Sequence, residues 1–187
     1  MITKTDLNRT VLISKFIDTG FFDHRIINTV DSGLMLAARK DSNLYIIKFN
    51  SSLTQQRSQR FPLGYSSTLS ERFSVAIERQ YVDTNDTEYF YVTTIAPTSI
   101  TGYKTKEIAF KVLKIASNGI LSWNNKYVDA GRASYSTGSV YDWVHAIQAT
   151  SLNKSTFCVV GTRWESDHGH ENQYLFYINI DQTGAII

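Results

Sequence analysis

One pattern occurs three times in this chain, and this repeat limits the fold more than any other feature. Each copy is an apolar stretch followed by a turn of small polar residues. The copies occupy residues 44–53, 109–119 and 174–184. Aligned on Lys48, Lys114 and Asn179, they stand 66 and 65 residues apart. Two nearly equal spacings across loops of different length indicate one duplicated structural unit.

Each unit can be filled with short strands separated by turn signals, and no segment shows a helical period over ten or more residues. The first unit predicts strands at 25–29, 34–39, 43–49 and 55–61. The second predicts 73–79, 88–95, 107–115 and 120–127, and the third predicts 143–150, 156–162 and 173–180, with a fourth strand beginning at 185. The pattern is typical of an all-β chain of four-stranded antiparallel units.

The two ends of the chain are predicted to complement each other. Residues 15–20, Lys-Phe-Ile-Asp-Thr-Gly, match residues 126–131, Lys-Tyr-Val-Asp-Ala-Gly, at the exit of the second unit's fourth strand. Residues 11–16 are therefore expected to form an outer fourth strand. Because the last unit stops as its own fourth strand begins, the N-terminal strand is complementary to it and could cover its open edge.

The third unit resembles the repeat of bacterial surface-type β-propellers. The resemblance rests on residues 147–150, 157–162 and 174–184, and on residues 112–123 of the second unit. It is clearest in residues 107–187. The first unit departs from the pattern, with Leu53 in place of the turn glycine and no Trp in its fourth strand.

This resemblance implies a single domain over residues 1–187, a partial β-propeller of about three four-stranded antiparallel blades. The blades would cover roughly residues 21–61, 70–127 and 140–187, with the N-terminal strand at 11–16. It also suggests an extracytoplasmic or surface location, although residues 1–10 carry no signal-peptide pattern. Such repeats imply a fold and not an activity.

Three blades do not close a propeller ring, which usually holds four to eight. Two arrangements follow, of which the first is slightly favoured. Two chains could pair about a two-fold axis as a homodimer with a six-bladed ring, each N-terminal strand finishing the partner's last blade. Alternatively, the chain is one segment that joins a partner propeller segment.

Charge and hydropathy exclude several classes of partner. The formal net charge is only +2, and the Lys and Arg residues are scattered, so no nucleic-acid footprint is present. No apolar run approaches the length of a membrane span, about 18 residues. The one cysteine, Cys158, lies in an apolar run and is expected to be a small buried hydrophobe.

The most polar segment, residues 164–171, is a weak candidate metal site. Asp167, His168, His170 and Glu171 offer nitrogen and oxygen ligands for a divalent cation. The segment is expected to be a short exposed loop, and a solvated turn is the favoured interpretation. No cofactor is predicted.

A weak ligand-binding site is predicted from aromatic residues of the third unit. Trp143 and Trp164 could stack on a sugar ring, although packing between blades is the commoner role of such residues. They are expected at opposite ends of adjacent strands. Tyr141 and Asp142 are placed on a connection that approaches the binding face of the propeller.

These observations predict a non-catalytic binding or assembly module that presents loops to a protein or a glycan. No catalytic residue is assigned, because no combination of nucleophile, acid and base stands out. Asp18 and Asp129 occur at equivalent repeat positions, which favours a turn over a catalytic carboxylate pair. The alternatives are a carbohydrate-active enzyme and a sugar-binding lectin on a propeller scaffold.

Overall fold

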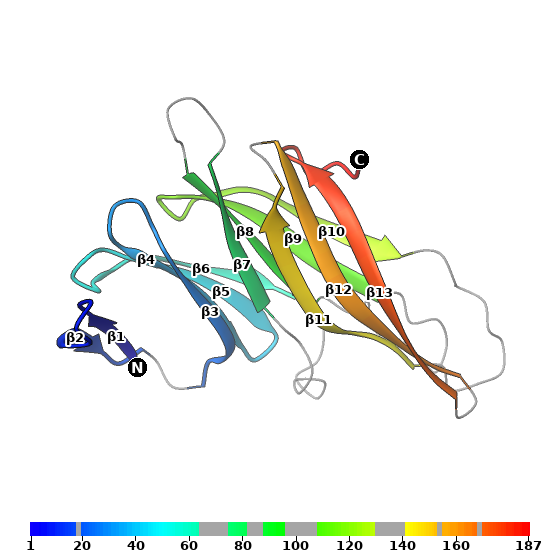
Figure 1. Ribbon diagram of the computed structural model, residues 1–187, viewed down its shortest axis with the longest axis horizontal. Helices are drawn as coiled ribbons and strands as arrows, with labels where there is room; N and C mark the ends of the chain where they lie inside the picture. Colours follow the sequence, from blue (N-terminus) through cyan, green and yellow to red (C-terminus); the bar gives the residue numbers. More distant parts are fainter. Residues whose placement is uncertain are drawn as a thin grey trace.

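A computed structural model of the chain describes residues 1–17, 20–63, 75–81, 88–95, 108–129, 141–152, 155–167 and 170–187. All the regular structure in these ranges is β, as the sequence predicts. No helix in these ranges is long and apolar enough to cross a membrane. The strands form one hairpin and three larger antiparallel sheets (Figure 1).

The sheets follow one another along the chain, and each is a simple meander. The N-terminal hairpin pairs β1 (Ile2–Thr5) with β2 (Val11–Lys15). The first sheet contains β3 (Phe22–Asn28), β4 (Leu34–Lys40), β5 (Asn43–Phe49) and β6 (Gln55–Pro62). The second contains β7 (Val75–Tyr81), β8 (Glu88–Ile95), β9 (Ile108–Ala116) and β10 (Leu121–Asp129). The third contains β11 (Tyr141–Ser151), β12 (Thr156–Asp167) and β13 (His170–Asp181).

The sheets stack face to face, because their middle strands are apolar on both sides. In β4, every residue from 35 to 39 is buried. Leu36 packs against Ile2 of the hairpin, whereas Met35 packs toward the second sheet with Phe90. The alternation of side chains along a strand therefore supplies two separate cores from one sheet.

Three hydrophobic cores hold the stack together. The first joins the hairpin to the first sheet, the second joins the first sheet to the second, and the third joins the second sheet to the third. The second core is the largest, and the third is the most aromatic: Phe157 stacks on Tyr91 with 4.3 Å between ring centroids. Such burial of apolar area is the main favourable term in folding.

The first strands of the three sheets lie along one side of the stack. β3 contacts β7, and β7 contacts β11. In Figure 1 these three strands follow one another across the middle of the molecule. Turn residues on successive sheets are consequently brought next to each other.

The strand predictions for the first two sheets are confirmed to within two residues at nearly every end. The strands predicted at 43–49 and 88–95 have the observed bounds. The prediction for the N-terminus is incomplete, because β1 was missed. Val11–Lys15 pairs with β1 and lies on the first sheet, so this strand does have a hairpin partner of its own.

The third sheet differs from the others at its two ends. It contains three strands, and the expected fourth is reduced to one bridge between Ile180 and Ile186. The predicted loop at 164–171 is wrong. β12 and β13 stay paired from Thr156 opposite Asp181 to Asp167 opposite His170, which makes one long hairpin.

Candidate functional site

Five turns with one geometry recur in the described part of the chain; one begins at Thr29, between β3 and β4, and we call the other four the repeat turns. They begin at Asp6, Asn50, Ala116 and Asp181 and span five residues each. In every one, the first backbone N–H donates to the fifth carbonyl, at 2.8–3.0 Å, and the fourth N–H donates to the first carbonyl, at 2.8–3.1 Å. The N-terminal hairpin therefore closes with the same turn as the three repeats predicted from the sequence.

The fourth residue of each repeat turn has a positive φ, which favours glycine. Gly119 and Gly184 meet this requirement, with φ of 81° and 88°. Leu53 and Arg9 adopt it as well, with φ of 55° and 65°. Leu53 is buried in the core beneath the hairpin, and that burial offsets the backbone strain.

A side-chain oxygen accepts the N–H of the fifth residue in all four repeat turns, and in the Ala116 turn it is Asn118 Oδ1, at 2.9 Å. The Oδ1 atom of the first residue accepts the N–H of the fifth residue at 2.8 Å in the Asp6 and Asn50 turns and at 2.9 Å in the Asp181 turn. Asp181 also accepts the Thr183 hydroxyl at 2.7 Å. This bond and those from backbone amides lower the pKa of Asp181, so the carboxylate stays charged in mildly acidic solution.

The second sheet grips the repeat turn of the third sheet. The Gln182 carbonyl accepts hydrogen bonds from Lys114 Nζ at 3.3 Å and from Trp123 Nε1 at 2.8 Å. The Gly184 carbonyl accepts the Tyr127 hydroxyl at 2.7 Å. A Cβ atom at Gly184 would overlap the Asn125 amide, so the close approach requires glycine here. Trp123 thus packs between the second and third sheets.

Lys114 is a buried cation in this contact, with Tyr89 and Tyr91 close by. Its Nζ atom lies 4.4 Å from the centre of the Tyr89 ring and 5.8 Å from that of Tyr91. Burial lowers the pKa of Lys114, and the charge of Asp181 partly opposes this shift. Rings and a backbone carbonyl therefore stabilise the ammonium group in place of water.

The hairpin grips the first sheet in the same way. Lys4 Nζ donates to the Ser51 carbonyl at 3.3 Å. Lys4 and Lys114 each stand two residues before their own repeat turn, and Ser51 and Gln182 are each the second residue of the turn they contact. One interaction therefore recurs between different pairs of sheets.

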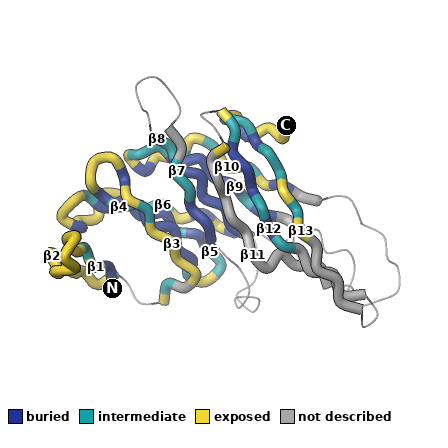
Figure 2. The backbone as a smooth tube through the Cα atoms, in the orientation of Figure 1, coloured by how far each residue is buried: buried dark blue, intermediate teal, exposed yellow. Residues whose placement is uncertain are grey.

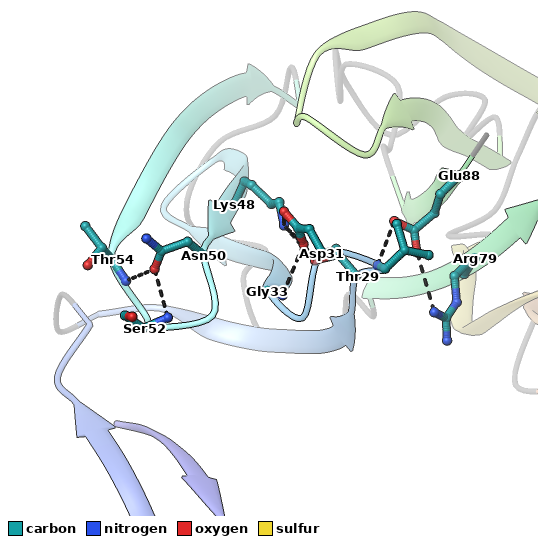
Figure 3. Close-up of polar contacts among 10 residues, drawn as sticks. Thr29, Asp31, Gly33, Lys48, Asn50, Ser52, Thr54, Arg79 and Glu88 are labelled. Carbon is teal, nitrogen blue, oxygen red and sulfur yellow. Dashed lines mark hydrogen bonds and ion pairs between the residues drawn. The ribbon is translucent and has the colours of Figure 1, made fainter. Parts of the chain in front are cut away.

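Lys48 has the corresponding position on the first sheet, but its ammonium group binds a carboxylate and not the carbonyl of the next turn. Its Nζ atom lies 2.7 and 2.9 Å from the two carboxylate oxygens of Asp31 and 2.6 Å from Thr29 Oγ1 (Figure 3). The Gly33 N–H donates to Asp31 Oδ1 at 3.0 Å. The Lys48 stem still lies beside the next repeat turn, because a Cβ atom added at Gly119 would be in ordinary contact with Lys48 Cβ, at 3.5 Å.

A second buried charge ties the first sheet to the second. Glu88 Oε2 accepts the Val30 backbone N–H at 3.2 Å, and Arg79 Nη1 lies 3.5 Å from Glu88 Oε1. The Glu88 side chain is fully buried. Figure 3 shows this pair next to the Lys48 cluster, on the side of the first sheet that meets the second. Both groups are paired internally, as buried charges must be.

The third sheet leaves one of its faces open. Phe157, Val159 and Ile180 face the second sheet and are buried. On the opposite face of β13, Leu175 and Tyr177 are 73% and 72% exposed. Figure 2 shows exposed and half-buried positions alternating along this strand. The corresponding faces of the hairpin and of the first two sheets are covered by the next sheet, whereas no sheet in the described part of the chain covers this face.

The structure changes the placement of the predicted ligand residues. Trp143 and Trp164 are direct cross-strand partners, not residues at opposite ends of adjacent strands. Tyr141 and Asp142 belong to β11, opposite Ser166 and Glu165, and not to a connection. The side chains of these aromatic and acidic residues lie outside the described part of the structure.

The predicted metal residues lie near the tip of the β12–β13 hairpin. Asp167 and His170 are cross-strand partners, and Glu171 follows on β13. His168 and the side chains of the other three lie outside the described residues, as do Asp18 and the side chain of Asp129. Among the side chains that are described, no three His, Cys, Asp or Glu groups come together as a cation site. Cys158 is buried, as expected.

Sequence reasoning missed the lysine contacts between sheets. A signal was available, because Lys4, Lys48 and Lys114 all precede a turn by two residues. The turn at Asp6 was not predicted, and without it Lys4 could not be recognised as equivalent to Lys48 and Lys114. In comparisons with known proteins, no family model and no curated protein matches the chain.

Proposed function

We propose that this chain is a non-catalytic assembly module built as a partial β-propeller. Its three larger sheets correspond to the three predicted blades, and the N-terminal hairpin corresponds to the outer half of another. Repeat turns at equivalent positions and first strands that neighbour one another support this assignment. The proposal assigns the chain no reaction.

The single observation that carries the proposal is the open face of the third sheet. Leu175 and Tyr177 expose apolar surface on the side where each earlier sheet is covered. Two large exposed apolar side chains on one strand favour association with another protein surface. The favoured partner is a second copy of the chain, in a closed dimer; a separate propeller segment is the alternative.

The molecular mass in solution tests this proposal. The 187-residue chain should approach about 42 kDa by light scattering as its concentration rises, twice the 21.2 kDa of one chain. Tyr177→Glu should lower the association constant at least tenfold, because a carboxylate would be buried without a partner. Ile120→Glu is the matched control, since Ile120 is exposed in a repeat turn outside this face. A monomer at every concentration would contradict the proposal.

The cross-strand pair of Trp143 and Trp164 supports a second candidate, glycan binding. Aromatic residues on neighbouring strands are close enough to form one stacking surface. We expect Trp164→Ala to abolish any signal on a glycan array while leaving the mass of the assembled chain unchanged. An array with no signal for the unchanged chain removes this candidate.

A further inference from the structure

We infer that the open face of the third sheet receives the Asp6 repeat turn of a second copy of this chain. This inference rests on the proposed assembly function and names the two surfaces that meet. The repeat turn that begins at Asp6 would pack against the open face of β13, as the repeat turns inside the chain pack against the preceding sheet. Asn179 of one copy would then donate its side-chain amide to the Leu7 carbonyl of the other.

The first support is the hydrogen bond that recurs between a lysine of one element and the repeat turn of the next. Lys4 binds the second carbonyl of the Asn50 turn, and Lys114 binds the second carbonyl of the Asp181 turn. Asn179 stands two residues before its own repeat turn, as these lysines do. Asn179 therefore has the same position as the lysines that bind the turn of the next sheet, and it lies on a face that no described sheet covers.

The second support is the Asp6 turn, which no side chain of a preceding described element contacts. The turns at Asn50 and Asp181 are held by the preceding element, and the turn at Ala116 lies against Lys48 and Arg57. Among the described residues, nothing holds the Asp6 turn in this way. Leu7, its second residue, is fully exposed, and its carbonyl is the counterpart of the carbonyls of Ser51 and Gln182.

The third support is the apolar character of both surfaces. On the hairpin, Ile13 packs into the core over the first sheet, whereas Leu12 points to the other face and is exposed. On the third sheet, Leu175 and Tyr177 are exposed. Placing Leu12 against Tyr177 would bury apolar area on both partners and extend the stacking seen inside the chain.

Each copy carries one turn and one open face, so the contact is head-to-tail. Two copies can make it twice about a two-fold axis and leave neither surface free. The expected product is a closed dimer. A contact that does not close would instead give a continuing series of copies, whose mass would keep rising with concentration.

Cross-linking tests which surfaces meet. Two single-cysteine variants, Leu7→Cys and Asn179→Cys, are made in a Cys158→Ala background and mixed with a short bismaleimide. A covalent dimer is expected from this mixture. Ser51→Cys mixed with Asn179→Cys is the control, because Ser51 has the same place in a turn already held by Lys4. Equal yields from the two mixtures would overturn the inference.

A gain in affinity provides an independent test. Asn179→Lys would place at this position the lysine that Lys4 and Lys114 provide elsewhere. Because a hydrogen bond from a charged group is the stronger one, the association constant should rise about fivefold. No rise, in a chain that forms dimers sensitive to Tyr177→Glu, would overturn the choice of the Asp6 turn and leave the assembly function intact. A monomeric chain would overturn both.

Discussion

Phe157→Ala is expected to lower the free energy of unfolding by about 4 kcal/mol, the usual cost of truncating a buried phenylalanine. Phe157 is buried and stacks on Tyr91, with 4.3 Å between the ring centroids. The two rings come from different sheets and lie in the core that joins the second sheet to the third. Truncation would leave a cavity there and weaken the attachment of the third sheet.

Equilibrium unfolding in urea measures this change. The matched control is Leu175→Ala, because Leu175 lies on the exposed face of the same sheet. Its cost should stay within about 0.5 kcal/mol in the monomer, as for most surface substitutions. Equal costs for the two variants would show that the third sheet is not held through the Tyr91 contact.

The repeat could be predicted from the sequence because strand periodicity and burial agree in it. Aligning Lys48, Lys114 and Asn179 identified positions that the structure makes equivalent, each two residues before a repeat turn. Apolar residues on both faces of β5 and β9 fix the register, since a slip of one residue would exchange the two cores. The stacking order of the sheets then follows from their order in the chain.

The hairpin and the long arm of the third sheet could not be predicted in the same way. β1 has only four residues, and Arg9 occupies the position of its turn where glycine is expected. The outer part of the third sheet, where β12 pairs with β11 as far as Ser166 and with β13 as far as Asp167, has few apolar residues. The polar sequence therefore resembled a loop, and the pairing of Trp143 with Trp164 was missed.

The lysine contacts depend on tertiary proximity, which sequence spacing alone does not give. Lys48 and Lys114 have the same place in the repeat, yet one binds a carboxylate in its own sheet and the other a carbonyl in the next. The difference arises from Asp31, in the turn between β3 and β4 of the first sheet. One residue in a neighbouring turn thus redirects an otherwise repeated contact.

The Lys48–Asp31 pair should respond unequally to loss of its two partners. The Lys48 side chain is 2% exposed, whereas that of Asp31 is 52% exposed. Asp31→Ala would leave a buried ammonium group whose remaining side-chain acceptor is the Thr29 hydroxyl, at a cost of about 3 kcal/mol. Lys48→Met keeps the apolar stem and leaves a carboxylate that water can reach, so its cost should be about 1 kcal/mol. Urea unfolding at neutral pH compares the variants, and equal costs would contradict this account.

The pH dependence of stability checks the same contact independently. Burial tends to raise the pKa of Asp31, but hydrogen bonds from Lys48, Thr29 and Gly33 outweigh it and lower the pKa below its ordinary value of 3.8. Because the folded pKa is the lower one, the contact stabilises the chain fully above about pH 5, and this stabilisation is lost as the pH falls from the ordinary pKa through the lower, folded pKa. The stability difference between the unchanged chain and Asp31→Asn should therefore be constant from about pH 6 to 8 and shrink below about pH 4. A difference that stays the same down to about pH 3 would mean that the carboxylate charge is not what holds Lys48 in place.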